Sequence, residues 1–161
     1  MVIRGLAAAI GMLVATATDA MVWQVAELPP GDLTIVDVTV GDDGFLAAAL
    51  GTDLNFLWSA DGASWSEVGQ IDLGPAMGRL ARGSGVYVFV SPVGSHACGD
   101  PNCIWVSTTG AQWTRLDFDA PVRDVFQIAY WNGRFVALGR PVESEGRQPY
   151  VLVSENGFEW H

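Results

Sequence analysis

The chain has 161 residues, half of them hydrophobic and only 16% charged, which excludes a generally disordered protein and allows one domain with a substantial core. The formal net charge of −10 disfavours nucleic acid and anionic lipid as partners, because both are bound through surfaces rich in lysine and arginine. Nineteen glycines and seven tryptophans suit short strands, tight turns and aromatic packing, so the composition predicts an all-β fold.

Residues 1–20 have two interpretations. An early arginine, an apolar run and the small residues of "ATA" and "TDA" match a secretory signal peptide with its cleavage site. Alternatively, the segment contributes strands to a partial repeat, since "ATDAMVW" keeps the acid and the tryptophan of the motif described below. The segment is too short and too rich in glycine and alanine to predict a stable membrane span.

One heptapeptide recurs along the rest of the chain, as "SADGASW" from Ser59, "STTGAQW" from Ser107 and "SENGFEW" from Ser154. The serines lie 48 and 47 residues apart, and each copy follows an apolar run. Upstream of each copy, a polar-glycine turn precedes another strand, in "DDGFLAAAL", "GSGVYVFV" and "WNGRFVALG". Four short strands per period of about 40 to 50 residues indicate the blades of a β-propeller. We expect propeller repeats over residues 21–161, with blades at 33–70, 76–118 and 122–161.

Each heptapeptide predicts a hairpin turn. The pairs Asp61-Gly62, Thr109-Gly110 and Asn156-Gly157 would lie at the turn centre, with positive φ at both positions. The serine hydroxyl would bond to the turn backbone, and the tryptophan would pack against the adjacent blade. A group repeated in every unit is structural, so Ser59 is not expected to be a nucleophile. The residues of the motif are Ser59, Asp61, Gly62, Trp65, Ser107, Gly110, Trp113, Ser154, Asn156, Gly157 and Trp160.

These heptapeptides resemble the Asp-box, or bacterial neuraminidase repeat, of sialidases and of many secreted bacterial propellers. The usual pattern is Ser-x-Asp-x-Gly-x-x-Trp, whereas this chain has a shortened version with aspartate only at Asp61. The resemblance implies the propeller fold over nearly all of residues 21–161. It does not imply an activity, because non-enzymatic propellers carry the same turns.

Sialidases, as the resemblance implies, hold a substrate carboxylate with three arginines and use a tyrosine–glutamate nucleophile pair. The candidates in this chain are Arg79, Arg82, Arg115, Arg123, Arg134 and Arg140, with Tyr87, Tyr130 and Tyr150. Three of these arginines fall within one repeat, so they suit a clamp built from three blades poorly, and we assign no catalytic residue. The acid pairs Asp42-Asp43 and Asp117/Asp119 are expected to be solvent-exposed. Residues 130–133 ("YWNG") offer an aromatic sugar platform, although packing is the favoured role.

Cys98 and Cys103 are separated by Gly-Asp-Pro-Asn, a turn-forming spacer that brings two cysteines within disulfide range. A zinc site that adds His96 and Asp100 is disfavoured, because no second cysteine or histidine pair exists elsewhere. A disulfide implies an oxidising compartment, so we expect a secreted or cell-surface protein.

The sequence therefore predicts a non-catalytic secreted β-propeller scaffold that binds a protein or carbohydrate ligand, with no cofactor and no metal. The alternatives are a fragment of an exo-sialidase-like glycoside hydrolase and an assembly factor resembling photosystem II stability factors. Three blades do not close a ring of the usual 4 to 8. We therefore expect the chain to be part of a larger propeller.

Overall fold

The structure is a computed structural model that describes residues 12–13, 23–74, 76–91, 104–117, 122–141 and 149–161. Within these residues the chain forms strands and no helix, which confirms the predicted all-β class. Most of segment 1–20, together with Cys98 and Cys103, lies outside the described residues. The strands are β1 (Met12–Leu13), β2 (Trp23–Gln24), β3 (Thr34–Val40), β4 (Phe45–Leu50), β5 (Leu54–Ser59), β6 (Ser66–Ile71), β7 (Arg79–Gly83), β8 (Val86–Val90), β9 (Ile104–Ser107), β10 (Thr114–Arg115), β11 (Val122–Trp131), β12 (Arg134–Pro141) and β13 (Tyr150–Ser154).

Strand pairing divides the described chain into three larger sheets. Strands β3–β6 form the first sheet, β7–β10 the middle sheet and β11–β13 the third sheet, while β1 pairs only with β2. Every pair is antiparallel, and strands adjacent in the sequence are adjacent in the sheet. Each repeat of the sequence therefore folds as one up-and-down meander.

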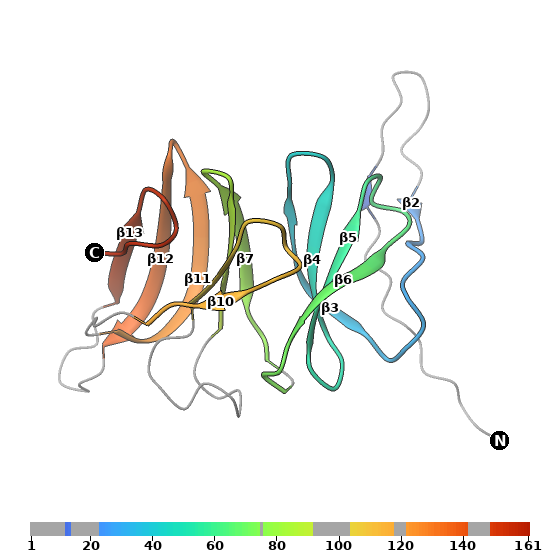
Figure 1. The fold of residues 1–161 in the computed structure, drawn as a ribbon, viewed down its shortest axis with the longest axis horizontal. Helices are drawn as coiled ribbons and strands as arrows, with labels where there is room; N and C mark the ends of the chain where they lie inside the picture. Colours follow the sequence, from blue (N-terminus) through green and yellow to red (C-terminus); the bar gives the residue numbers. More distant parts are fainter. Residues whose placement is uncertain (1–11, 14–22, 75, 92–103, 118–121, 142–148) are drawn as a thin grey trace.

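The three sheets lie side by side in chain order, with the middle sheet between the other two (Figure 1). Strand β8 lies between the other two sheets, and all five of its residues are therefore buried. Tyr87 and Phe89 join the core shared with the first sheet, whereas Val86, Val88 and Val90 join the core shared with the third. A strand covered on both faces reads as an unbroken apolar run, as "VYVFV" does.

Strand β4 is rich in alanine, which favours helix in isolation. Its two faces are both covered, because Leu46 and Ala48 face the middle sheet while Ala47 and Ala49 belong to a third core cluster. Burial on both sides of a paired strand therefore decides its conformation. Small side chains at these positions leave room for the layers that cover them.

The first strands of the three larger sheets, β3, β7 and β11, lie next to one another. Polar contacts connect them: the Asp37 carboxylate accepts a hydrogen bond from the Leu80 amide at 2.7 Å. Arg82 forms an ion pair with Asp42, in the turn that follows β3. The sheets are thus joined along their first strands as well as through their faces.

The segment before β3 covers the far face of the first sheet. Leu28 and Leu33 pack against the cluster that contains Ala47 and Leu57. The Glu27 amide donates to the Ala63 carbonyl at 2.7 Å, and the Glu27 carbonyl accepts from the Trp65 amide at 3.0 Å. The motif of the first sheet is therefore covered by this segment.

Candidate functional site

The most distinctive groups of the chain are the three heptapeptide turns, here called boxes 1, 2 and 3 (residues 59–65, 107–113 and 154–160). Box 1 connects β5 to β6, box 2 connects β9 to β10, and box 3 follows β13. In each box the serine hydroxyl accepts a hydrogen bond from the glycine amide at 2.8 Å. Ser59, Ser107 and Ser154 are all buried. Hydroxyls held this way by their own turn are structural groups, not exposed nucleophiles.

The third position of each box supplies an oxygen acceptor. Asp61 Oδ1 accepts from the Ala63 amide at 2.8 Å and from the Ser64 amide at 3.0 Å. Asn156 Oδ1 accepts from the equivalent pair, the amides of Phe158 and Glu159, at 2.8 and 2.9 Å. In box 2 the Thr109 hydroxyl accepts from one amide, that of Ala111, at 3.2 Å. Aspartate, asparagine and threonine therefore serve the same backbone groups.

The indole nitrogen of each box tryptophan donates a hydrogen bond to its own turn. Trp65, Trp113 and Trp160 donate from Nε1 to the carbonyl of the box glycine at 3.0, 3.0 and 2.9 Å. Each indole is half-buried. The ring position is thus fixed by its own box before it meets any neighbour.

The expected backbone of the box was wrong in one respect. Only the glycines, Gly62, Gly110 and Gly157, have positive φ, at 77°, 79° and 82°. The preceding residue has ordinary φ in all three boxes, so the turn is not the two-residue type with both φ positive. The side-chain acceptor at the third position replaces that geometry, because it holds the following amides in an Asx-type turn. Two-residue turns with both φ positive occur elsewhere, at Ser84–Gly85 and Asn132–Gly133.

The turn of box 1 shifts the titration of Asp61. Hydrogen bonds from the Ser64 and Ala63 amides, together with one from the Ser59 hydroxyl, lower the pKa of its carboxyl below the usual aspartate value. These bonds favour the charged form because a carboxylate accepts them better than a carboxylic acid does. The side chain is an anionic acceptor at neutral pH, which suits a structural cap and not a general acid.

Box 2 rests on the first sheet, as the sequence predicted for the tryptophan. The indole of Trp113 stacks on the ring of Phe56 in β5, with centroids 4.1 Å apart and planes 23° apart. Beside it, a Cβ added to Gly110 would lie 2.9 Å from Leu46 Cδ1 in β4. A Cβ added to Gly69 in β6 would collide with the carbonyl oxygen of Ala111. Box 2 therefore contacts three strands of the preceding sheet.

Box 3 sits on the middle sheet in the same manner. A Cβ added to Gly157 would lie 2.8 Å from Val86 Cγ2 and 3.1 Å from Val88 Cγ2, both in β8. Trp160 packs against the core cluster that the middle and third sheets share. Each of these two boxes thus joins its own sheet to the one before it.

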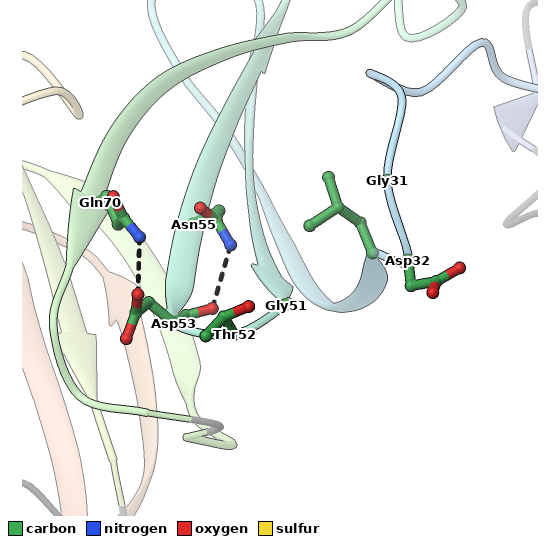
Figure 2. Close-up of a pocket in the computed structure, with 8 residues that line it drawn as sticks. Gly31, Asp32, Gly51, Thr52, Asp53, Asn55 and Gln70 are labelled. Carbon is green, nitrogen blue, oxygen red and sulfur yellow. Dashed lines mark hydrogen bonds between the residues drawn. The ribbon is translucent and has the colours of Figure 1, made fainter.

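A pocket of about 550 Å³ lies at the other end of the first sheet, beside the turn between β4 and β5 (Figure 2). The Asp53 carboxylate accepts from Gln70 Nε2 at 2.9 Å, and the Asp53 carbonyl accepts from Asn55 Nδ2 at 3.0 Å. Asn55 is a buried polar residue next to Leu54 and Phe56 in β5, while Thr52 is exposed. The lining residues are Gly31, Asp32, Leu33, Gly51, Thr52, Asp53, Asn55 and Gln70.

The sequence interpretation did not identify this pocket. A usable signal was present, since a polar residue lies two positions after the turn "GTD" at 51–53, inside the strand "LNFLW". An asparagine at a buried strand position must satisfy its amide, and the carbonyl of the preceding turn does so.

The arginine candidates make contacts within the chain. Arg82 pairs with Asp42 and lies over the Tyr87 ring, 4.6 Å from its centroid. Arg79 donates to the Gly78 carbonyl at 3.1 Å. Other arginine contacts include an ion pair between Arg134 and Glu155 at 3.3 Å, one between Arg115 and Asp117 at 3.7 Å, and a ring contact between Arg140 and Phe126 at 5.8 Å. The side chain of Arg123 lies outside the described residues.

The tyrosine and tryptophan candidates have different environments. Tyr130 packs on Phe135 with centroids 4.7 Å apart, and its hydroxyl lies 3.1 Å from the Ser84 hydroxyl. Trp131 is 79% exposed, so only one of the two adjacent aromatics is available to a ligand. Asp42 and Asp43 are exposed, as expected, and so is Asp117, whereas Asp119 lies outside the described residues.

In the part of the chain that the structure describes, no group of three or more histidine, cysteine or acidic side chains could hold a metal ion. Nor do the described residues include a helix long and apolar enough to cross a membrane. His96, Cys98, Asp100 and Cys103 lie outside them. No protein-family model matches the chain, and no curated protein is significantly similar to it.

Proposed function

We propose that the protein is a non-catalytic β-propeller scaffold that binds a ligand or a protein partner. The observation that carries this proposal is that the polar groups of the box side chains bond within their own turns. Every serine hydroxyl, third-position oxygen and indole nitrogen of the three boxes is hydrogen-bonded within its own turn. Groups that hold three equivalent turns do not form a single catalytic centre.

The propeller arrangement is supported by how the sheets meet. Antiparallel meanders stack face to face in chain order, and their first strands lie next to one another. In a propeller the first strand of each blade lines the central axis, and the faces of successive blades form the core. Boxes 2 and 3, each seated on the sheet before it, supply the contacts that such stacking requires.

A sialidase-like activity has less support. It needs arginine side chains available to bind a substrate carboxylate, whereas the described arginines have partners within the chain. Secretion and a Cys98–Cys103 disulfide remain parts of the proposal that rest on the sequence. An assembly-factor role remains an alternative on the same basis.

The pocket beside the β4–β5 turn is the proposed ligand site. Its volume of about 550 Å³ lies within the roughly 300 to 1,000 Å³ of small-molecule sites. The Asp53 carboxylate accepts hydrogen bonds, whereas the amides of Asn55 and Gln70 both donate and accept. A set of close polar groups of both kinds suits the hydroxyls of a carbohydrate better than an apolar ligand.

A glycan microarray with neutral and sialylated glycans, followed by titration of the best glycan, tests this site. Asp53→Ala should weaken binding at least tenfold, because it removes a carboxylate from the pocket lining and releases Gln70. Asp72→Ala is the matched control, since Asp72 is an exposed acid outside the pocket lining and should bind as the unmodified protein does. No binding anywhere on the array, or equal binding by both variants, would refute the pocket assignment.

A fluorogenic sialoside assay tests the non-catalytic part separately. We expect no turnover above that of a heat-denatured sample. Turnover that disappears on Arg82→Met would contradict the proposal, provided that the variant keeps the strand signal in circular dichroism.

A further inference from the structure

The outer face of the third sheet carries an apolar patch, with the polar residues Gln127 and Arg140 on the same face. Val136 in β12 is 38% exposed and Val151 in β13 is 54% exposed, and Leu138 lies beside them, paired with Val151. No described segment covers this face, which lies at the end of the row of sheets opposite the first sheet (Figure 1). Branched apolar side chains on a regular sheet face are typical of a surface that another layer covers.

The strand register identifies the equivalent positions in the other two sheets. The box serine pairs with Phe45 in the first sheet, with Tyr87 in the middle sheet and with Phe135 in the third. In the first and middle sheets the residue after this one, Leu46 or Val88, points to the next sheet along the chain, and Val136 has the equivalent position in the third sheet. The residue three before each serine gives a second equivalent set, Phe56, Ile104 and Val151.

We call these equivalent positions the seats, because the box of the following sheet packs on them. Leu46 lies under Gly110 of box 2, and Val88 lies under Gly157 of box 3. Phe56 carries the stacked indole of Trp113. Leu46, Phe56, Val88 and Ile104 are each 0% exposed, so their seats are filled. Val136 and Val151 have the same positions in the third sheet without a described box upon them.

Backbone pairing at the edge of the third sheet also matches that of the middle sheet. The His161 amide donates to the Val153 carbonyl at 3.1 Å, and the Val153 amide donates to the His161 carbonyl at 2.8 Å. In the middle sheet the residue after the box tryptophan, Thr114, pairs with Val106 at the equivalent place. His161 thus pairs with the third sheet at the place where β10 begins in the middle sheet.

We propose that the outer face of the third sheet binds a further antiparallel sheet that carries the same Ser-x-x-Gly-x-x-Trp turn. Its glycine lies over Val136, and its tryptophan stacks on Val151. This inference rests on the propeller arrangement of the proposed function but not on the ligand pocket, so failure of the glycan experiment leaves it intact. The occupant is specified by its fit, because boxes 2 and 3 already occupy two copies of this seat.

An extended protein tests the proposal directly. Residues 1–160 are followed by a second copy of residues 66–118, so that β6 continues the third sheet and a complete middle-sheet unit follows with its own box. Val151→Asp is then placed in both the natural and the extended chain, and the unfolding equilibrium constant of each is measured in urea. Val25→Asp is the matched control, because Val25 is 76% exposed and belongs to the segment before β3.

In the natural chain we expect both substitutions to change the unfolding constant by less than about threefold, as exposed sites usually do. In the extended chain Val151→Asp should raise that constant by at least tenfold, because the new indole covers the position, while Val25→Asp should still have little effect. Converting the tryptophan of the added box to alanine should remove this difference.

Equal effects of Val151→Asp in the two chains would overturn the proposal. Because an added unit can fail for its own reasons, a second extension with residues 114–161 in place of 66–118 is measured as well, and failure of both refutes it. Sedimentation of the natural chain adds one more decisive outcome. A dimer that Val151→Asp dissociates would show that a second copy of the chain, not a box-bearing sheet, occupies the face.

Discussion

The stack of Trp113 on Phe56 is predicted to be a main energetic link between the first and middle sheets. Trp113→Ala removes an indole that lies 4.1 Å from the Phe56 ring and that donates to the Gly110 carbonyl at 3.0 Å. Because Trp113 is half-buried, about half of the roughly 200 Å² that a tryptophan can bury is lost. At about 25 cal/mol per Å² this burial contributes about 2.5 kcal/mol.

The aromatic geometry contributes about 1 kcal/mol beyond the buried area, and a partly exposed hydrogen bond adds about 0.5 kcal/mol. We therefore expect Trp113→Ala to lower the free energy of unfolding by about 3 to 4 kcal/mol. Trp113→Phe keeps a ring on Phe56 but loses the indole nitrogen, so its cost should be only about 1 to 1.5 kcal/mol.

Urea unfolding followed by far-ultraviolet circular dichroism measures these costs without relying on tryptophan fluorescence, which the substitutions alter. Trp131→Ala is the control, because Trp131 is 79% exposed and should change stability by less than about 0.5 kcal/mol. A double-mutant cycle with Phe56→Leu isolates the pair, for which we expect a coupling of about 1 kcal/mol. A cost of Trp113→Ala no larger than that of the control would refute this reasoning, and so would an absent coupling.

Two further predictions concern the box turns. Asp61 has a lowered pKa in the folded state, so its stabilising effect is present above the unfolded value of about 3.9 and is lost as the pH falls through the lower folded value. Asp61→Asn should therefore reduce the loss of stability between pH 5 and pH 2 while leaving stability at pH 7 nearly unchanged; an unaltered acid profile in thermal melts would contradict this. Gly110→Ala should cost about 2 to 3 kcal/mol, because φ is +79° and the new Cβ would crowd Leu46, whereas Gly85→Ala, at +78° with open space around it, should cost only about 1 to 2 kcal/mol. Equal unfolding free energies for the two glycine variants would show that box 2 is not tightly seated on the first sheet.

Much of the fold could be predicted because the repeat combines local signals that agree. In strand β8, "VYVFV" has strong strand propensity, and the glycine turn before it ends at Gly85. Strand β4 lacks such a local signal, because "FLAAAL" is predicted as a strand only by its place in the repeat. Propensity alone would favour a helix there, and the layers on both of its faces override it.

The box residues could be predicted by spacing, but their backbone could not. An Asp-Gly or Asn-Gly pair in a short hairpin favours two positive φ values, and this rule holds at Asn132–Gly133. In the boxes the serine three residues before the glycine accepts the hydrogen bond of the glycine amide, and only the glycine adopts positive φ. The pocket was missed for another reason, since residues 31–33, 51–55 and 70 converge only through sheet pairing. A single sequence does not reveal such convergence.

The differences among the three boxes separate what the turn requires from what it tolerates. The serine, the glycine and the tryptophan are present in all three, and each has a contact that other residue types replace poorly: a compact hydroxyl for the glycine amide, a positive φ, and an indole that both donates and stacks. The third position needs only an acceptor. Aspartate and asparagine serve two amides and threonine serves one. The turn therefore does not require a charged residue at the third position, and the shared requirement is an oxygen acceptor at one place.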